Sequence, residues 1–197
     1  MKILAFVDLH GNKLFLNEII ERAKREKPHL IICAGDLSDW GRNLNSILSK
    51  INKIGILTLI IHGNHESEEE LTKIIKPLKS IIFLHGSSYK INKYIFFGYG
   101  GGGFALEDKK LEKIIKKVKT IKKRSKIILV THAPPYNTTL DRLDHMGHLG
   151  SKSIRKFIEE VNPVLNICGH LHENTGNVDK IKRTKIINPG NGAILEV

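Results

Sequence analysis

The run Ile3-Leu4-Ala5-Phe6-Val7-Asp8-Leu9-His10 opens the chain with an apolar, β-rich segment that ends in two side chains able to bind a metal ion. Other apolar runs end in the same way, at Asp36, Asn64, His132 and His170. In an open α/β sheet the carboxyl ends of the strands share one edge, so residues far apart in the chain can meet there. We therefore expect an α/β fold with its functional site at the carboxyl ends of the strands.

Short β-rich runs alternate with amphipathic helical patterns in the first part of the chain. The sequence predicts strands at 2–7, 30–34 and 56–61, with helices between them at 13–26 and 44–53. Ser67, which precedes three glutamates, predicts the N-cap of a further helix that Pro77 ends.

The second part of the chain has a different pattern. Strands predicted at 81–84, 89–91 and 94–98 are too close in sequence for helical crossovers and should pair locally. After a glycine loop at 100–103, the pattern predicts helices at 107–124 and 151–161 and strands at 126–130, 164–168, 185–187 and 193–197. This order implies two mixed sheets with helices outside them, in a single domain that spans residues 1–197.

The composition is that of an ordinary globular protein, because 41% of the 197 residues are hydrophobic and 26% are charged. This excludes the disordered, collagen-like and disulfide-rich classes. Cys33 and Cys168 each end an apolar run, so we expect inert core thiols. No apolar run is long enough to cross a bilayer, and the first one ends at Asp8 without a signal-peptide cleavage site. We expect a cytoplasmic protein with no membrane partner.

The formal net charge is +12, from 32 basic and 20 acidic residues. Such charge attracts nucleic acid through its phosphates. The lysines from Lys109 to Lys123, however, lie on the face of a predicted helix without interleaved aromatic residues. Enrichment in lysine and isoleucine is also typical of thermophilic proteins. Nucleic-acid binding is therefore an open alternative that the sequence does not favour.

Each metal-capable fragment alone is a weak signal. Their order resembles that of the calcineurin-like metallophosphoesterase superfamily, and the resemblance rests on Asp8-Leu9-His10, Gly35-Asp36, Gly63-Asn64-His65-Glu66, Thr131-His132 and Gly169-His170-Leu171-His172. It implies a four-layer αββα sandwich, with two mixed β-sheets flanked by helices. It also implies a metal site at the carboxyl ends of the strands.

The resemblance further implies a dinuclear metal centre. Asp8, His10 and His172 would hold one ion, Asn64, His132 and His170 would hold the other, and Asp36 would bridge the two. A mixed set of oxygen and imidazole ligands suits Mn²⁺, Fe²⁺, Ni²⁺ or Zn²⁺ better than calcium or magnesium, and we expect manganese first. A bridging carboxylate is needed because it screens two cations that lie only about 3.5–4 Å apart.

Two further residues receive catalytic roles from the resemblance. His65 would protonate the leaving group while a hydroxide that bridges the ions attacks phosphorus, and Asp39 would orient His65. Glu66 allows two interpretations: a charge at the start of the next helix, or a support for catalysis.

The segment from Ala133 to Gly150 follows a proposed metal ligand and is long for a simple connection. Tyr136, Arg142 and His148 are its candidates for substrate binding, through an aromatic face and through contacts to phosphate or ribose oxygens. The alternative is a surface lid without direct contacts to the substrate.

Trp40 stands where phosphoprotein phosphatases of the superfamily carry an arginine that binds phosphate. Residues 131–136 and 168–173 instead resemble the small bacterial and archaeal phosphoesterases related to cyclic-nucleotide phosphodiesterases. We therefore expect hydrolysis of a small phosphodiester, with a cyclic nucleotide as one candidate. The alternatives are a phosphomonoesterase or phosphoprotein phosphatase, a nuclease or nucleic-acid-binding protein, and a non-catalytic scaffold of the same fold. The sequence leaves the oligomeric state open.

Overall fold

The computed structural model describes residues 1–122 and 125–197. The first part of the chain alternates strands and helices as predicted, with β1 (Lys2–Phe6), α1 (Lys13–Glu26), β2 (Leu30–Cys33), α2 (Leu44–Asn52), β3 (Thr58–Ile60), α3 (Glu68–Ile75) and β4 (Ile81–Phe83). Neighbouring strands of this series pair in parallel. The last strand of the chain, β13 (Ala193–Glu196), pairs antiparallel with β1 and completes a sheet of order β13-β1-β2-β3-β4.

The second part of the chain forms the other large sheet and its two helices. Its elements are β5 (Ser88–Ile91), β6 (Tyr94–Tyr99), α4 (Lys109–Lys122), β7 (Lys126–Thr131), β8 (Arg142–Leu143), β9 (Gly147–His148), α5 (Lys152–Val161), β10 (Leu165–Ile167), the single 3₁₀ turn η1 (His172–Asn174), β11 (Val178–Ile181) and β12 (Thr184–Ile187). The strand order is β11-β12-β10-β7-β6-β5. The two outermost strands are antiparallel to their neighbours, so the sheet is mixed.

Three predictions about elements need correction. The strand β4 does not pair with β5 and β6; it pairs in parallel with β3, because α3 provides the crossover between them. The strand β11 was not predicted, since only two of its four residues, Val178 and Ile181, are apolar, and its charged residues suit an edge strand. The loop 133–150 contains the short hairpin β8–β9. The last two residues of the helix predicted at 107–124 lie outside the described residues.

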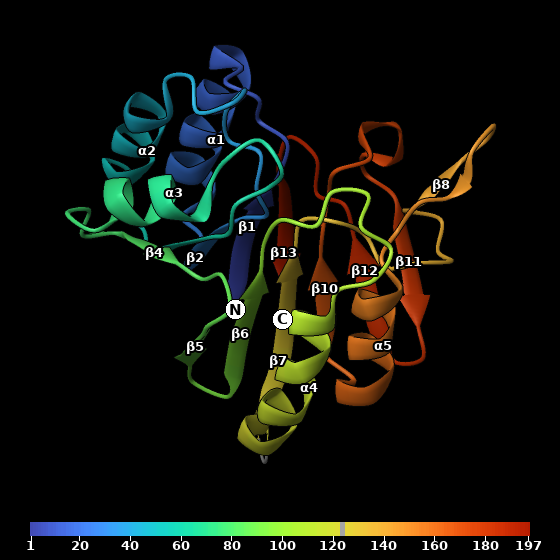
Figure 1. The fold of residues 1–197 in the computed structure, drawn as a ribbon. Coiled ribbons are helices and arrows are strands. Elements are labelled where there is room, and N and C mark those ends of the chain that lie inside the picture. Colours follow the sequence, from blue (N-terminus) through green and yellow to red (C-terminus); the bar gives the residue numbers. More distant parts are fainter. Residues whose placement is uncertain (123–124) are drawn as a thin grey trace.

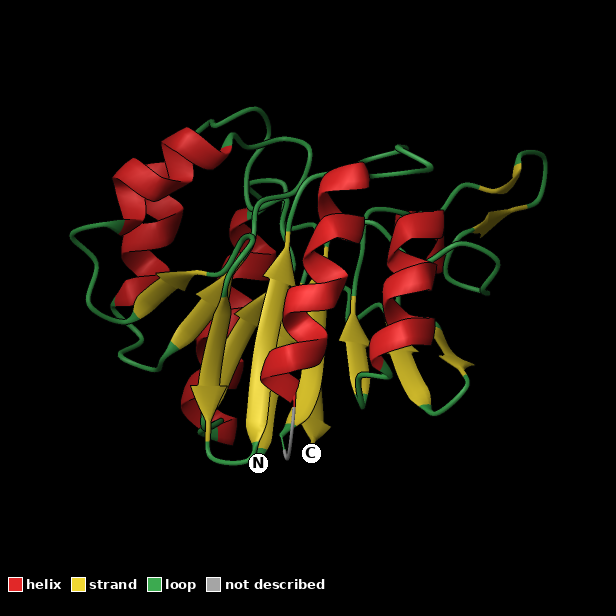
Figure 2. Ribbon diagram, turned by 60° about the horizontal axis from the view of Figure 1, so that its bottom comes forward, coloured by secondary structure: helices red, strands yellow, loops and turns green. Residues whose placement is uncertain are grey.

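The two sheets stack face to face and helices cover their outer faces, which confirms the four-layer αββα sandwich (Figure 1 and Figure 2). Alternation along β1 shows how the sequence builds these layers. Ile3 and Ala5 pack in the core between the sheets, whereas Leu4 and Phe6 pack in a second core under α1, α2 and α3. A third core lies between the second sheet and the helices α4 and α5. The strand β2, which is buried on both faces, is apolar throughout, as parallel strands in such folds commonly are.

The lysine-rich helix α4 is amphipathic. Leu111, Ile115 and Val118 recur at helical spacing and are buried against the second sheet, so the lysines between them belong to the outer face. Cys33 and Cys168 are fully buried, and burial raises the pKa of both thiols, as expected for inert core cysteines. In the part of the chain that the structure describes, no helix combines the length and apolar character needed to cross a membrane.

Candidate metal centre

The metal-capable residues all follow the carboxyl ends of strands, and Figure 1 shows the loops that carry them along the upper edge of the sheets. Asp8 and His10 follow β1, Asp36 follows β2, and Asn64 follows β3, all in the first sheet. From the second sheet, His132 follows β7, and His170 and His172 follow β10. The site therefore lies where the two sheets meet, and neither sheet could build it alone.

Asp8, His10 and His172 form a first group, whose possible ligand atoms all lie within 4.8 Å of one another. His10 Nδ1 lies 2.7 Å from Asp39 Oδ1, so this nitrogen donates its proton to the carboxylate. The other ring nitrogen, Nε2, then carries a lone pair, and it faces His172 Nε2 at 3.1 Å. Two imidazole nitrogens and a carboxylate that converge in this way are suited to hold a cation.

A second group forms around His132, which is fully buried. Its Nδ1 lies 3.0 Å from the Ala34 carbonyl oxygen and donates to it, which directs Nε2 into the site. This Nε2 lies 2.9 Å from Asn64 Oδ1 and 3.3 Å from Asp36 Oδ2. The His170 ring lies 5.1 Å from that of His132, between ring centroids. The structure thus brings together all seven predicted ligand residues.

Unpaired buried atoms test whether this site fits metal ions. Asp8 Oδ1 and His170 Nε2 are buried and have no hydrogen-bond partner among the described residues. Buried polar atoms are almost always paired in native proteins. A cation would satisfy both atoms, so the residues present fit the divalent ions that the sequence implies, although their role as ligands stays a prediction.

The electrostatics of the protein without metal ions are consistent with a cation site. Burial alone would raise the pKa of Asp36, but the hydrogen bond and charge of His132 outweigh it and lower this pKa to about 2. Burial alone would lower the pKa of His132, but Asp36 and Asp8 outweigh it and raise this pKa. A proton on His132 therefore balances the carboxylates. Since a metal ion would displace this proton, affinity should fall as the pH falls.

Other ionisable ligands respond mainly to burial. Burial raises the pKa of Asp8, because it disfavours the charged carboxylate. Burial and the charge of His132 lower the pKa of His170 to about 4. His170 is therefore neutral at pH 7, which is the form that binds a metal ion.

The loops that carry these residues turn sharply after their strands. Asp8, Asp36 and His170 have positive φ angles of 55°, 52° and 74°, which are uncommon for residues other than glycine. Gly63 permits the closest approach, because a Cβ atom at this position would lie only 1.9 Å from Asp36 Oδ1. Backbone strain of this kind persists only where surrounding contacts enforce it.

Glu66 supplies such contacts, and its role could not be decided from the sequence. Its buried carboxylate accepts hydrogen bonds from the backbone N–H groups of Asp36 (3.1 Å), Ser38 (2.8 Å) and Gly63 (3.1 Å). It therefore joins the loop after β2 to the loop after β3. Burial raises the pKa of Glu66 despite these hydrogen bonds. Glu66 therefore fixes the backbone of Asp36 without being one of the proposed metal ligands.

His65 lies beside the ligand groups, but its expected partner makes a different contact. Asp39 Oδ1 is 3.7 Å from His65 Nδ1, beyond hydrogen-bond distance, and only 2.7 Å from His10 Nδ1. The reason is local, because the backbone N–H of His10 donates to the Asp36 carbonyl oxygen at 3.0 Å. The loop that carries Asp39 is thereby held against His10. Asp39 thus hydrogen-bonds to His10, and the expectation that it orients His65 stays a prediction.

The three substrate candidates in the loop 133–150 make different contacts. His148 Nδ1 lies 2.8 Å from Asp141 Oδ1, and its ring packs near that of Tyr136. Asp141 also accepts the backbone N–H of Thr138 and Gly150, so His148 belongs to a network that organises the loop. Arg142 is the β8 residue that pairs with His148 in the β8–β9 hairpin, and it also contributes to a cavity. The cavity has a volume of about 410 Å³ and is also lined by His145, Met146, Glu173 and Asn174. Of these residues, Glu173 directly follows the proposed ligand His172 in sequence.

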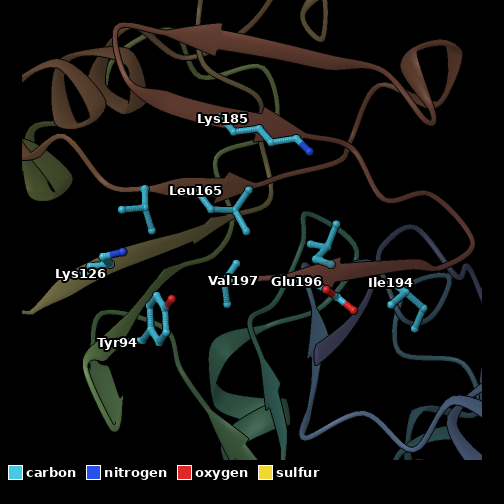
Figure 3. Close-up of a pocket in the computed structure, with 9 residues that line it drawn as sticks. Tyr94, Lys126, Leu165, Lys185, Ile194, Glu196 and Val197 are labelled. Atoms are coloured by element: carbon cyan, nitrogen blue, oxygen red, sulfur yellow. The ribbon is translucent and has the colours of Figure 1, made fainter. Parts of the chain in front are cut away.

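Another cavity, of about 310 Å³, lies at the opposite ends of the strands (Figure 3). Lys126 and Leu165, at the starts of β7 and β10, line it together with Lys185, Tyr94 and residues of β13. It contains none of the predicted ligands or catalytic residues. This cavity is therefore separate from the candidate metal centre.

Two mixed sheets that gather candidate metal ligands at one edge are the arrangement expected of a metal-binding phosphoesterase. The sequence model of the calcineurin-like phosphoesterase family matches residues 1–174, and the chain belongs to this family. An uncharacterized protein of Methanocaldococcus jannaschii is 34% identical to this chain over an aligned length of 204 positions. The alignment covers 96% of this chain and 88% of that protein.

Solved structures show the same fold at low sequence identity. A dimetal phosphatase from Danio rerio superposes with a TM-score of 0.71 at 11% identity, covering 95% of this chain and 86% of the other. A structure described as a novel archaeal phosphodiesterase superposes with a TM-score of 0.59 at 16% identity, covering 96% and 84%. At these identities the similarity concerns the fold.

We expect Glu66→Gln to destabilise the protein. The substitution keeps the size of the side chain but replaces an acceptor oxygen with an NH₂ group, which must face a backbone N–H in either orientation. The free energy of unfolding should fall by about 1–3 kcal/mol, the cost of an unsatisfied buried group. Metal affinity should fall as well, because Asp36 loses part of its support. Chemical denaturation and metal titration measure the two effects.

Glu69→Gln is the matched control, because this carboxylate is exposed and pairs with Lys73 on the surface of α3. It should change the free energy of unfolding by less than about 0.5 kcal/mol. Equal effects of the two substitutions would contradict the role assigned to Glu66.

Proposed function

We propose that this chain is a metal-dependent phosphodiesterase with a dinuclear centre. The observation that supports this most is the set of facing atoms that are able to bind a metal ion: His10 Nε2 opposite His172 Nε2, and His132 Nε2 opposite Asn64 Oδ1. In the proposed assignment, Asp8, His10 and His172 hold one ion, Asn64, His132 and His170 hold the other, and Asp36 contacts both.

When bound, two divalent ions would activate a water molecule and neutralise charge on the phosphoryl group. Asp8 and Asp36 are the only anionic members of the proposed ligand set, so two dications would leave the site positive toward a phosphate ester. Manganese is the proposed ion, because the mixed ligand set suits borderline metals. A small phosphate ester in the cytoplasm is the proposed substrate.

His65 is the proposed general acid. Its backbone N–H donates to Asp36 Oδ1 at 3.0 Å, and its Nε2 lies 4.0 Å from Asp36 Oδ2, so the imidazole is held beside the bridging carboxylate. From there it can deliver a proton to the oxygen that leaves phosphorus. Asp39 is a positioning residue that hydrogen-bonds to His10 and lies close to His65.

A substrate screen tests the proposed reaction. Reconstituted with Mn²⁺, the protein should hydrolyse bis-p-nitrophenyl phosphate and small diesters, including cyclic nucleotides, in preference to p-nitrophenyl phosphate. The reverse preference would make it a phosphomonoesterase. Cleavage of single-stranded DNA, with salt-dependent retention on DNA, would make it a nuclease. A protein that binds two ions and hydrolyses none of these would be a scaffold.

Metal analysis after reconstitution should give two ions per chain. Asp36→Asn should weaken both sites, because it removes the negative charge that screens the two cations. Asp144→Asn is the control, since this carboxylate is exposed in the turn of the β8–β9 hairpin. One ion per chain at saturation, in a folded protein, would refute the dinuclear centre.

His65→Ala should lower the rate most for esters with poor leaving groups, because these need a proton as the bond to phosphorus breaks. The loss for alkyl leaving groups should be about 10²–10⁴-fold. For nitrophenolate, which departs readily as an anion, the loss should be smaller. The exposed His29, which precedes β2 at the other end of the sheet, provides a control through His29→Ala. A uniform loss across leaving groups of different basicity would remove His65 from the acid role.

A further inference from the structure

An exposed tryptophan lies directly against the proposed general acid. The Trp40 ring is 4.5 Å from the His65 ring between centroids, with only 31° between the planes, so the two rings are loosely stacked. The Trp40 residue nevertheless leaves 74% of its surface exposed. Large aromatic side chains normally bury most of their surface, so an indole in this position needs an explanation.

Hydrogen bonds restrain the backbone of the loop that carries Trp40. Trp40 has a φ of +53°, which is an outlier for a bulky residue. The backbone on either side is tied down: Gly41 N–H donates to Ser38 Oγ at 3.1 Å, and Arg42 N–H donates to the Asp39 carbonyl oxygen at 3.1 Å. Ser38 is itself buried and bonded to Glu66. A strained backbone that its surroundings enforce points to a function for the residue it carries.

We propose that Trp40 is the platform for the leaving group, and that this group carries a nucleobase or another flat aromatic ring. The inference rests on the proposed function, because it assumes that His65 protonates the leaving oxygen. A substituent on that oxygen extends beyond His65, and the next surface there is the exposed indole face. Stacking on an indole is favourable for any base or aryl ring and requires no particular pattern of hydrogen bonds.

A second exposed ring provides a contrast on the other side of the site. Phe104 leaves 64% of its surface exposed and lies 4.5 Å from the His170 ring, but at an angle of 62°. It therefore meets a proposed ligand histidine edge to face. Trp40, in contrast, contacts the histidine that faces the leaving group. Phe104 accordingly serves as the matched control for an exposed aromatic residue near the metal centre.

Internal competition within one substrate tests the platform. In a nucleoside 5′-(methyl phosphate), either the nucleoside or methanol can leave, and both are alkyl alcohols that need the same acid. The wild-type protein, loaded with metal, should release mainly the nucleoside and methyl phosphate. Trp40→Ala and Trp40→Leu should lower the ratio of nucleoside to methanol about tenfold. Trp40→Phe should keep most of the preference, and Phe104→Ala should leave the ratio unchanged.

The same ratio distinguishes a platform from a support for His65. If Trp40 only positioned the imidazole, Trp40→Ala would slow both cleavages alike and the ratio would stay at its wild-type value. That result would overturn the proposal while leaving the phosphodiesterase function intact. A wild-type ratio that favours methanol would overturn it as well.

Fluorescence provides a readout that needs no turnover, because Trp40 is the only tryptophan of the chain. Adenosine 5′-monophosphate should quench its emission in the zinc-loaded protein with a saturable curve. Ribose 5-phosphate, which lacks the base, should compete with the nucleotide without quenching. Absence of quenching by the nucleotide at saturating concentration would overturn the platform. Because the quenching measurement does not depend on hydrolysis, it still tests the role of Trp40 if the proposed function fails.

Discussion

The carboxylate of Asp36 connects the two sheets at the site, and the surrounding architecture depends on it. Its Oδ2 lies 3.3 Å from His132 Nε2 of the second sheet, and its Oδ1 accepts the backbone N–H of His65 in the first. The residue is almost entirely buried. A buried charge is tolerated only when charged or polar groups compensate it. Here His132 compensates it in the absence of metal ions, and divalent cations would compensate it more fully.

This arrangement requires a rigid frame around the ligands. Glu66 accepts three backbone N–H groups and thereby ties together the loops that follow β2 and β3. The second sheet is attached to the first through the His170 N–H, which donates to Asp8 Oδ2 at 2.9 Å, and through His132 Nδ1, which donates to the Ala34 carbonyl oxygen at 3.0 Å. The hydrogen bonds of the loops therefore complete the junction that the apolar core between the sheets begins.

The same rigid frame bears on how a specific substrate could be selected at a site whose proposed metal ligands do not distinguish between phosphate esters. The proposed ligands surround the phosphorus position and would serve any phosphate ester. Selection must come from side chains beyond them, and Trp40 exposes an aromatic ring beside the proposed general acid His65. The loop 133–150 contributes differently: Asp141 engages His148, whereas Arg142 lines a cavity together with Glu173, the residue that follows His172.

The sequence by itself determined which residues would meet, because strand periodicity and the positions of strand ends are local properties of the chain. The alternation of strand and helix patterns predicted two sheets with helices outside them, and the metal-capable residues after β1, β2, β3, β7 and β10 predicted the edge that holds the site. Only the tertiary structure decided that Asp39 contacts His10, that Glu66 supports Asp36, and that Trp40 stacks on His65. Each of these contacts depends on how closely loops that are distant in sequence approach one another. Such approaches arise from packing and backbone hydrogen bonds across the whole fold, and no local pattern encodes them.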